Sequence, residues 1–235
     1  MDRNPNPDCT LCSVRPEIFS DNLKPEALAV LSMKKSCRKF KKGQIIFHEG
    51  QRAGGLYCIS HGKVKLFKTS YEGKEQIVRL SKAGDILGYR AVIGDQPYSA
   101  SAAALEETHI CMIPRDELLR HITQNPEMAM SLIKFLGNEL SVAEKRMMNL
   151  AQKSVRERLA ETLIILKETY GTEDDQQTLS VALSREDLAN ITGTATETVI
   201  RLIADFKKEG LIDTSGKKIL LKNVRGLINE GNIHD

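Results

Sequence analysis

Glycine recurs at short, nearly regular intervals through residues 40–113, and this spacing limits the possible folds more than any other feature of the chain. The runs between the glycines, such as 44–47 and 62–67, are short and β-prone. Such runs, separated by turn residues, are typical of an antiparallel sandwich or barrel. We therefore predict an antiparallel, jelly-roll-like β-roll, with short helices before it at 24–33 and after it at 114–122.

A long helix is predicted to begin at Pro126, because Asn125 is a suitable N-cap and proline is favoured in the first helical turn. Its apolar residues alternate at spacings of three and four, which is the pattern of a heptad seam. The seam consists of Ile133, Leu136, Leu140, Ala143, Met147 and Leu150. With charged residues beside it, this seam favours a parallel two-stranded dimer; the alternative is a helix packed on its own domain.

Two short helices joined by a tight turn are predicted in the last third of the chain. An S-x-x-D cap at 184–187 starts the first helix, and we expect a capping box at 194–197 to start the second. The turn between them contains Gly193, and a hairpin with Gly216 in its turn follows. The expected elements are helices at 155–167, 185–191 and 195–209, a strand at 177–181, and hairpin strands at 211–213 and 218–221. This order indicates a winged helix-turn-helix.

The second short helix has one apolar stripe that should face the core, made of Val199, Leu202, Ile203 and Phe206. In a major groove its other side would read bases: Arg201 can bond guanine, Glu197 can accept from cytosine, and Ile200 can contact a thymine methyl. The alternative is that Glu197 only caps the helix and Arg201 only pairs with it. The predicted DNA-contacting residues are Ser184, Arg185, Thr194, Thr196, Glu197, Ile200, Arg201, Lys217 and Lys218.

Charge does not by itself identify a nucleic-acid partner, because the whole chain carries a net charge of only +3. Residues 153–235 hold 12 basic and 14 acidic side chains. Within 201–225, however, seven basic residues oppose three acidic ones, so phosphate contacts are locally feasible. We expect the acidic stretch 173–175 to point away from DNA.

Together, these features resemble the CRP/FNR family of bacterial transcription regulators over nearly the whole chain. The segments similar to the family's cyclic-nucleotide-binding β-roll are 44–50, 56–59, 62–64, 72–75 and 84–88. Those similar to its helix-turn-helix are 183–188 and 197–201. The resemblance implies a homodimer on a palindromic promoter site, base contacts by Glu197 and Arg201, and RNA polymerase as a further partner.

The departures from the family pattern concern the effector. Cyclic-AMP receptors have Gly-Glu where this chain has Gly88-Tyr89, and Arg-Ser where it has Tyr98-Ser99. The adenine-contacting threonine of the long helix falls at Ala143. Because neither tyrosine supplies a fixed charge for an anion, the resemblance implies that cyclic AMP is not the effector. Arg90 could replace the missing cation, although it could equally be a solvated loop residue. The candidate effector contacts are Tyr89, Arg90, Tyr98 and Ser99.

The five cysteines are scattered and odd in number, so we expect thiols, ligands or redox groups rather than a disulfide scaffold. Oxygen-sensing FNR proteins are similar at Cys9, Cys12 and Cys111, which correspond to three of their four iron-sulfur ligands. The fourth would fall near Ile18, so a cluster is an alternative that we do not favour. We favour Cys111 as a core β residue and Cys9 with Cys12 as an exposed CxxC pair, with no metal site.

We predict an α+β protein with an N-terminal segment at 1–23, a β-roll sensor at 24–125, a dimerisation helix at 126–152 and a winged helix-turn-helix at 153–235. The predicted function is sequence-specific transcription regulation in response to an unidentified effector. An iron-sulfur or thiol-based redox regulator is one alternative. A thiol oxidoreductase using Cys9 and Cys12 is less well supported, because no βαβ pattern follows the CxxC. A small-molecule-binding module would leave exposed Ile200 unexplained.

No catalytic constellation stands out in the sequence, so we expect a protein that is not an enzyme. No stretch is apolar enough to span a membrane, and no signal peptide is recognisable at the N-terminus. We therefore expect a cytoplasmic protein without a membrane partner.

Overall fold

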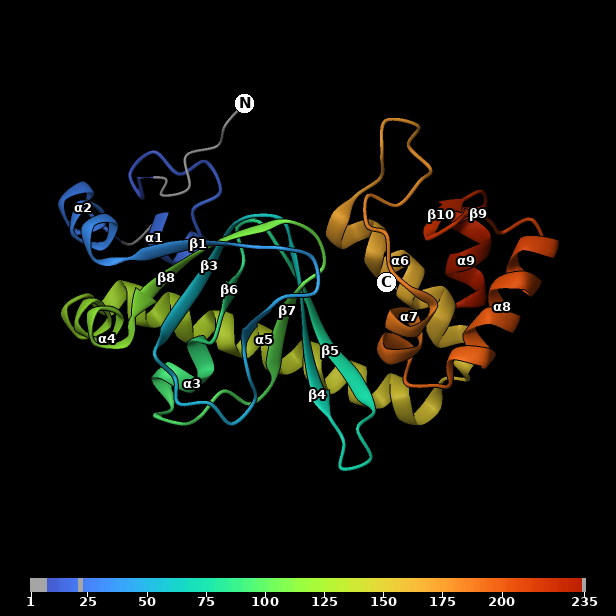
Figure 1. Cartoon of the computed structure of the whole chain (residues 1–235), viewed down its shortest axis with the longest axis horizontal. Helices are drawn as coiled ribbons and strands as arrows, with labels where there is room; N and C mark the ends of the chain where they lie inside the picture. Colours follow the sequence, from blue (N-terminus) through green and yellow to red (C-terminus); the bar gives the residue numbers. More distant parts are fainter. Residues whose placement is uncertain (1–7, 21–22, 234–235) are drawn as a thin grey trace. The chain divides into compact units, whose positions relative to one another are not determined.

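The computed structural model describes residues 8–20 and 23–233, and the chain divides into two compact units. The first unit comprises Met1–Lys68 and Val78–Ser141, and the second comprises Thr69–Ile77 and Val142–Asp235. Figure 1 labels the elements of both units, which are described separately below. Of the predicted N-terminal segment 1–23, residues 1–7 and 21–22 lie outside the described residues.

Two four-stranded sheets have strand orders β1-β8-β3-β6 and β2-β7-β4-β5, and their strands lie in the first unit except for Thr69 and Glu75–Ile77. The strands are β1 (Ser36–Phe40), β2 (Ile45–Phe47), β3 (Gly55–His61), β4 (Lys63–Thr69), β5 (Glu75–Lys82), β6 (Ile86–Leu87), β7 (Ser101–Ala104) and β8 (Thr108–Pro114). The pairs that include β3, β7 and β8 are antiparallel. The predicted antiparallel β-roll is therefore confirmed.

Four short helices accompany the sheets: α1 (Glu17–Ser20), α2 (Pro25–Lys34), α3 (Tyr89–Ile93) and α4 (Arg115–Gln124). Leu31 of α2, Leu56 of β3, Leu87 of β6 and Leu118 of α4 are almost fully buried in one core. The predicted helices at 24–33 and 114–122 thus exist, because each contributes leucines to this core.

Gly88 is the N-cap of α3, and its backbone conformation and close neighbours favour glycine. Its φ is +77°, and a Cβ there would lie 2.9 Å from Tyr98 Cε1 and 3.2 Å from the carbonyl oxygen of Gly55. Gly88 therefore allows the Tyr98 ring to pack directly against the backbone at the start of α3.

The long helix α5 (Pro126–Gln152) is confirmed, and Asn125 caps it. The side-chain oxygen of Asn125 accepts hydrogen bonds from the backbone amides of Glu127 and Met128, both at 3.1 Å. Met128 and Leu132 are buried in the core of the first unit. From Ile133 onward, several large apolar residues of α5 are exposed.

The second unit has the predicted winged helix-turn-helix order. Its elements are α6 (Val155–Tyr170), α7 (Arg185–Thr192), α8 (Thr196–Lys208), β9 (Ile212–Ser215), β10 (Lys218–Leu221) and α9 (Val224–Glu230). Ser184 forms the predicted cap of α7 through a capping box with Asp187. Gly193 ends α7 in the left-handed conformation, with φ +71°, which turns the chain into α8.

Three local predictions in this unit are wrong. The capping box at 194–197 does not form: α8 has Ala195 at its N-cap without a side-chain bond, so Thr194 lies one residue too early. The strand at 177–181 is replaced by two isolated bridges, because the Asp175 side chain binds the backbone amides of Gln177 and Thr178 in a local turn. The hairpin turn is shorter than expected, since Ser215 pairs with Lys218.

Candidate functional site

The two faces of α8 differ as the sequence predicted. Val199, Leu202, Ile203 and Phe206 are buried, whereas Glu197, Ile200 and Arg201 are exposed and Thr196 is half-buried. Ile200 keeps 52% of its surface exposed, beside the exposed Glu197 and Arg201. The two structural roles considered for Glu197 and Arg201 are not observed. Glu197 does not cap α8, and no ion pair joins Glu197 to Arg201 in the described chain.

Arg156 of α6 holds the C-terminal end of α8. Its Nη2 donates to Glu209 at 2.6 Å, its Nε donates to Glu230 of α9 at 2.6 Å, and its guanidinium lies 4.7 Å from the centre of the Phe206 ring. The hydrogen bond to Glu230 is the largest cause of a raised pKa of Arg156, and the Glu209 carboxylate adds to it. Sequence reasoning missed this anchor because both carboxylates lie more than 50 positions away.

The predicted wing residues differ in their surroundings. Arg185 Nη2 donates to the carbonyl of Gly216 at 3.4 Å, and burial lowers the pKa of Arg185. Lys217 is exposed, whereas Lys218 forms an ion pair with Glu173 at 2.7 Å. Glu173 of the acidic stretch 173–175 therefore partly neutralises one of the two predicted phosphate-contacting lysines.

Asp213 forms ion pairs with two lysines, Lys207 and Lys222, at the base of the wing. It accepts from Lys207 of α8 at 2.8 Å and from Lys222 at 3.2 Å, and its own side chain also accepts from the Thr214 amide. The bond to Lys207 is the largest cause that lowers the pKa of Asp213, followed by the Thr214 amide and Lys222. The wing is thus joined to the end of α8 by a carboxylate that stays ionised.

The four predicted effector contacts fall into two groups. Tyr89 and Tyr98 are buried, whereas Arg90 and Ser99 are exposed. The Tyr98 hydroxyl donates to the carbonyl of Gly55 at 2.9 Å and accepts from its amide, and the Tyr98 ring stacks on Phe47. Tyr98 therefore occupies space inside the β-roll with its hydroxyl already satisfied.

Tyr89 connects the β-roll to α5. Its hydroxyl donates to Glu139 of α5 at 2.9 Å and accepts from Arg79 of β5 at 2.8 Å, and Arg79 pairs with the same carboxylate at 2.7 Å. The Tyr89 ring also packs edge-on against Phe135 of α5. Burial raises the pKa of Tyr89 to about 12, although nearby Arg79 acts in the opposite direction. Sequence reasoning missed Arg79, because a charged residue on a strand gives no sign of a partner 60 positions away.

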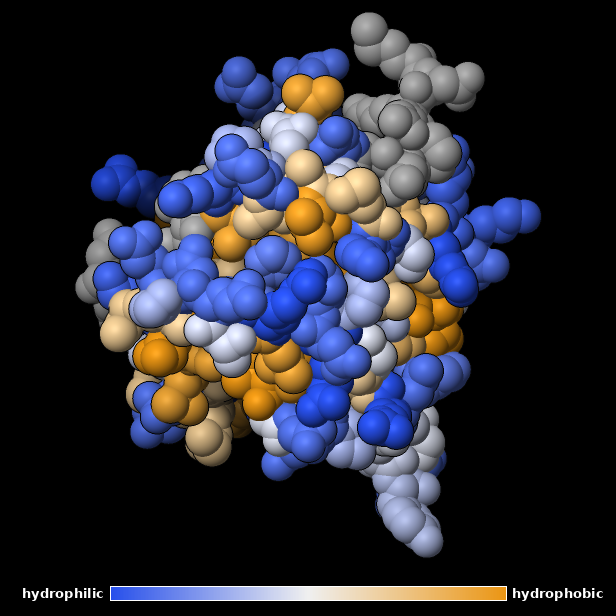
Figure 2. Space-filling model, turned by 90° about the vertical axis from the view of Figure 1, so that its left-hand side faces the viewer, coloured by the Kyte–Doolittle hydropathy of each residue, from blue (hydrophilic) through white to orange (hydrophobic). Residues whose placement is uncertain are grey.

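The predicted seam residues of α5 are mostly exposed. Ile133, Leu140 and Met147 are 60 to 67% exposed, Leu150 is 48% exposed, and Leu136 packs partly against the core of the first unit. Figure 2 shows several apolar patches on one face of the molecule. Seven of the fourteen exposed large apolar residues in the described chain lie on α5, which runs through both units, so much of the apolar surface of this helix is left uncovered.

Comparison with known proteins agrees with this architecture. Residues 37–125 match the cyclic nucleotide-binding domain, and residues 157–230 match the Crp-like helix-turn-helix domain. The transcriptional activator protein anr of Pseudomonas aeruginosa is 30% identical over 92% of this chain and 88% of its own length. The anaerobic regulatory protein of Bacillus subtilis is 31% identical over 89% of this chain and 90% of its own. The chain belongs to the CRP/FNR family.

A solved structure supports the same fold for this CRP/FNR protein. FixK2 from Bradyrhizobium japonicum superposes with a TM-score of 0.77 at 24% identity, covering 86% of this chain and 99% of that one. The protein is thus a transcription regulator of the CRP/FNR type, with an effector-binding domain and a helix-turn-helix, and regulators of this family bind DNA as dimers. None of the helices in the described residues is long and apolar enough to cross a membrane.

The cysteines of this CRP/FNR protein are arranged differently from the prediction. Cys37 of β1 and Cys111 of β8 form a disulfide, so the expectation of free thiols is wrong for this pair. The two residues are 74 positions apart but directly opposite each other in the register of β1 and β8, which sequence spacing cannot show. Cys9, Cys12 and Cys58 are free and partly buried.

This arrangement does not fit the four-thiolate cluster of the oxygen-sensing relatives. Cys111 has no thiolate to offer while it is bonded to Cys37, and Ile18, at the position of the fourth ligand, is buried in the core. Among the residues described, no group of three or more His, Cys, Asp or Glu is placed to hold a metal ion. The described cysteines therefore do not fit such a cluster.

Proposed function

We propose that this regulator binds a palindromic promoter site as a homodimer, with one α8 reading each half-site and RNA polymerase as its further partner. The observation that carries the proposal is the exposed face of α8, where Glu197, Ile200 and Arg201 are accessible and the opposite face is packed. A helix of this kind inserts its N-terminal turns into the major groove, where these side chains reach base edges.

The geometry of the wing supports phosphate contacts beside α8. Lys217 is exposed, and Arg185 lies close to the turn of the wing at Gly216. Contacts of this type fix the position of the protein on the duplex but do not select its sequence. We therefore assign base reading to Glu197 and Arg201, and positioning to Lys217, Ser184, Arg185 and the threonines at 194 and 196.

The exposed apolar face of α5 supports dimerisation. Leu140, Met147 and Leu150 lie on it at heptad spacing, and burying them against a second copy removes apolar surface from water. Symmetry of the dimer would place the two α8 helices on half-sites about one helical turn apart, or roughly 10 base pairs.

Selection of random oligonucleotides by the purified full-length protein tests the proposal and supplies a cognate duplex. Fluorescence anisotropy then compares Arg201→Ala and Glu197→Gln with matched controls at exposed sites elsewhere, Arg52→Ala and Glu168→Gln. Each α8 variant should weaken binding to the selected site by about 5-fold to 150-fold, the equivalent of 1 to 3 kcal/mol for a lost base contact. Binding that is equally tight to scrambled DNA would refute base reading by α8.

We propose that Arg90 and Ser99, which are exposed, contact the effector directly. Tyr89 and Tyr98 are buried, so we propose that they respond to effector binding through their contacts inside the protein. We propose that an effector acts on α5 through the Tyr89, Arg79 and Glu139 network, because this network joins β5 and α3 to α5. Unchanged effector-dependent DNA binding in an Arg90→Ala, Ser99→Ala double variant would remove the exposed pair from the effector site.

A further inference from the structure

Three of the five cysteines form a row across one sheet. Cys111 of β8 lies opposite Cys37 of β1 on one side and opposite Cys58 of β3 on the other. Residues directly opposite each other on neighbouring strands project from the same face of a sheet. The Cys37–Cys111 disulfide therefore has a third sulfur-bearing residue next to it.

The remaining two cysteines lie over the same face. Cys9, Cys12, Cys58 and Cys111 line one small, largely apolar cavity together with Lys35, whereas Cys37 is not among its lining residues. All five cysteines of the chain are thus gathered in one place, although they span more than 100 positions of the sequence. Neither the helix-turn-helix nor the effector domain accounts for this gathering.

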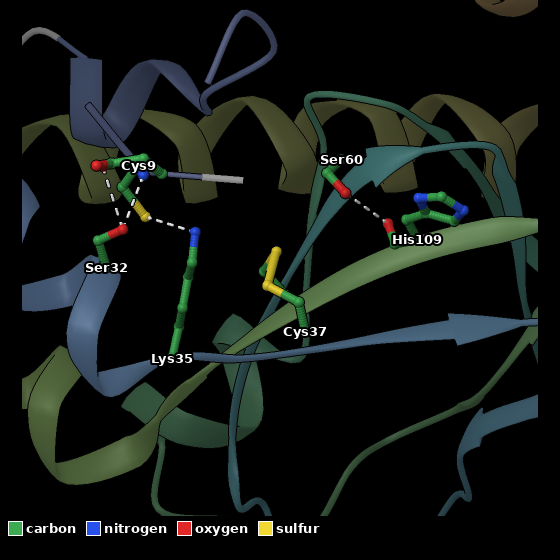
Figure 3. The surroundings of a disulfide bond; sticks show 8 residues. Cys9, Ser32, Lys35, Cys37, Ser60 and His109 are labelled. Carbon is green, nitrogen blue, oxygen red and sulfur yellow. Dashed lines mark hydrogen bonds between the residues drawn. A yellow bond between two sulfur atoms is a disulfide. The ribbon is translucent and has the colours of Figure 1, made fainter. Parts of the chain in front are cut away.

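The backbone around Cys9 is fixed on α2. The Cys9 amide donates to Ser32 Oγ at 3.0 Å, the Ser32 hydroxyl donates to Asp8 at 3.2 Å, and Arg15 donates to the carbonyl of Cys9 at 2.8 Å. These bonds hold the CxxC segment against the cavity. Figure 3 shows the Cys9 and Ser32 contacts and the disulfide of Cys37.

The free thiols have different electrostatic surroundings. Lys35 Nζ lies 3.3 Å from Cys9 Sγ and donates a hydrogen bond to it (Figure 3). Burial raises the pKa of Cys58, and nearby Cys9 and Cys12 act in the same direction, so Cys58 stays a neutral thiol. Because the thiolate is the reactive form, Cys9 is the better nucleophile.

We propose that Cys9, Cys12 and the Cys37–Cys111 disulfide form a thiol–disulfide exchange site. The Cys9 thiolate attacks the sulfur of Cys111, because Cys111 is the cysteine of the disulfide that lines the cavity. A Cys9–Cys111 bond forms, the Cys37–Cys111 bond breaks, and its electron pair leaves on Cys37, which takes up a proton from water.

A second exchange completes the transfer. Cys12 loses its proton and attacks Cys9 Sγ, so that a Cys9–Cys12 disulfide forms and Cys111 leaves as a thiolate and is protonated. One disulfide is exchanged for another, and neither step requires an external oxidant or reductant. The oxidised CxxC is then the group that a soluble dithiol reduces, so the substrate class of the site is a dithiol or its disulfide.

Trapping the intermediate tests this proposal in the full-length protein. Cys12→Ser removes the resolving thiol, so the Cys9–Cys111 link should accumulate after the protein purified in air is shifted from about pH 5 to about pH 7.5, where more thiolate forms. Acid quenching, alkylation and peptide mass spectrometry without reduction identify the link. Cys58→Ser is the matched control and should give the wild-type distribution of Cys37–Cys111 and Cys9–Cys12 disulfides.

Lys35 is tested as a positioning residue. In the Cys12→Ser background, Lys35→Gln should slow the appearance of the Cys9–Cys111 link roughly tenfold, the effect of losing one charge-assisted hydrogen bond, whereas Lys24→Gln at an exposed position should not. Circular dichroism checks that every variant is folded.

Two results would overturn the proposal. One is a Cys12→Ser protein that contains only the Cys37–Cys111 disulfide with Cys9 fully alkylated. The other is stoichiometric iron or zinc in anaerobically purified protein that is lost in Cys9→Ser, because the sulfurs would then be metal ligands. DNA binding is not part of either readout, so the exchange site and the DNA-binding function can fail independently.

Discussion

Glu161 of α6 provides the strongest test of how the second unit is held together. Its side chain is 11% exposed, and its carboxylate accepts from Asn149 Nδ2 at 2.8 and 2.9 Å and from Lys153 Nζ at 3.1 Å. Asn149 belongs to the last turns of α5, so this carboxylate joins the end of the long helix to the first helix of the DNA-binding unit.

Replacing Glu161 with leucine should remove about 3 kcal/mol of the free energy of unfolding, the lower end of the range for losing one partner of a buried ion pair. We place it at the lower end because Lys153 Nζ also donates to the carbonyl of Gly231 at 2.8 Å and so keeps one acceptor. The Asn149 amide, which is buried, loses both of its carboxylate bonds. Since a domain is stable by only about 5 to 15 kcal/mol, this is a large fraction.

Urea unfolding followed by circular dichroism measures the loss, at one fixed protein concentration because dimerisation adds to stability. Glu168→Leu, the same substitution at an exposed position of α6, is the matched control and should change stability by less than about 0.5 kcal/mol. Adding Asn149→Leu to Glu161→Leu should restore most of the lost stability, because the buried amide that lost its carboxylate partner is then replaced by an apolar side chain and Lys153 keeps its bond to Gly231. A loss below about 1 kcal/mol for Glu161→Leu, or a double variant no more stable than the single one, would refute this account.

Three further predictions concern other parts of the chain. Glu173→Gln should release Lys218 from its ion pair, so that Lys218 can contact a phosphate. The slope of log binding constant against log salt concentration should then become steeper by up to about one unit, as measured by fluorescence anisotropy across a salt series. Leu140→Glu should weaken the dimer more than roughly tenfold in analytical ultracentrifugation, because two carboxylates would then meet in the seam. Burial, and secondarily Arg120, lowers the pKa of His121, so the unfolded chain binds the proton more readily than the folded one. The free energy of unfolding should therefore fall as the pH drops below the ordinary pKa of 6.5, and it should fall less in His121→Leu. Urea unfolding midpoints measured on both sides of that pH test this.

Local patterns in the sequence were enough to predict the winged helix-turn-helix. The Ser184 cap, Gly193 and the apolar stripe from Val199 to Phe206 each act within a few residues, so their spacing fixes the local backbone and the buried face. The capping box predicted at 194–197 does not form, which shows that local motifs do not fix the exact first residue of a helix. Thr194 and Glu197 have suitable chemistry, but the chain enters α8 one residue later than the motif requires.

Long-range contacts could not be predicted in this way. The Cys37–Cys111 disulfide, the Arg79–Glu139 ion pair and the Arg156 anchor join residues 53 to 74 positions apart, and each depends on strand register or helix packing. A single sequence gives the chemistry of these residues but not their neighbours. The spacing of the cysteines therefore favoured free thiols, and only the register of β1 with β8 brings two of them together.

Tyr89 and Tyr98, two of the four predicted effector contacts, both have hydroxyl groups that already make hydrogen bonds within the protein. The hydroxyl of Tyr98 is already bonded to Gly55, and that of Tyr89 to Arg79 and Glu139. An effector that used either hydroxyl would have to break a buried hydrogen bond, each worth about 1 kcal/mol, before it gained one. A ligand shifts a conformational equilibrium only through different contacts with the two states. The Glu139 contact is where such a difference would reach α5, because the same carboxylate binds both β5 and α3.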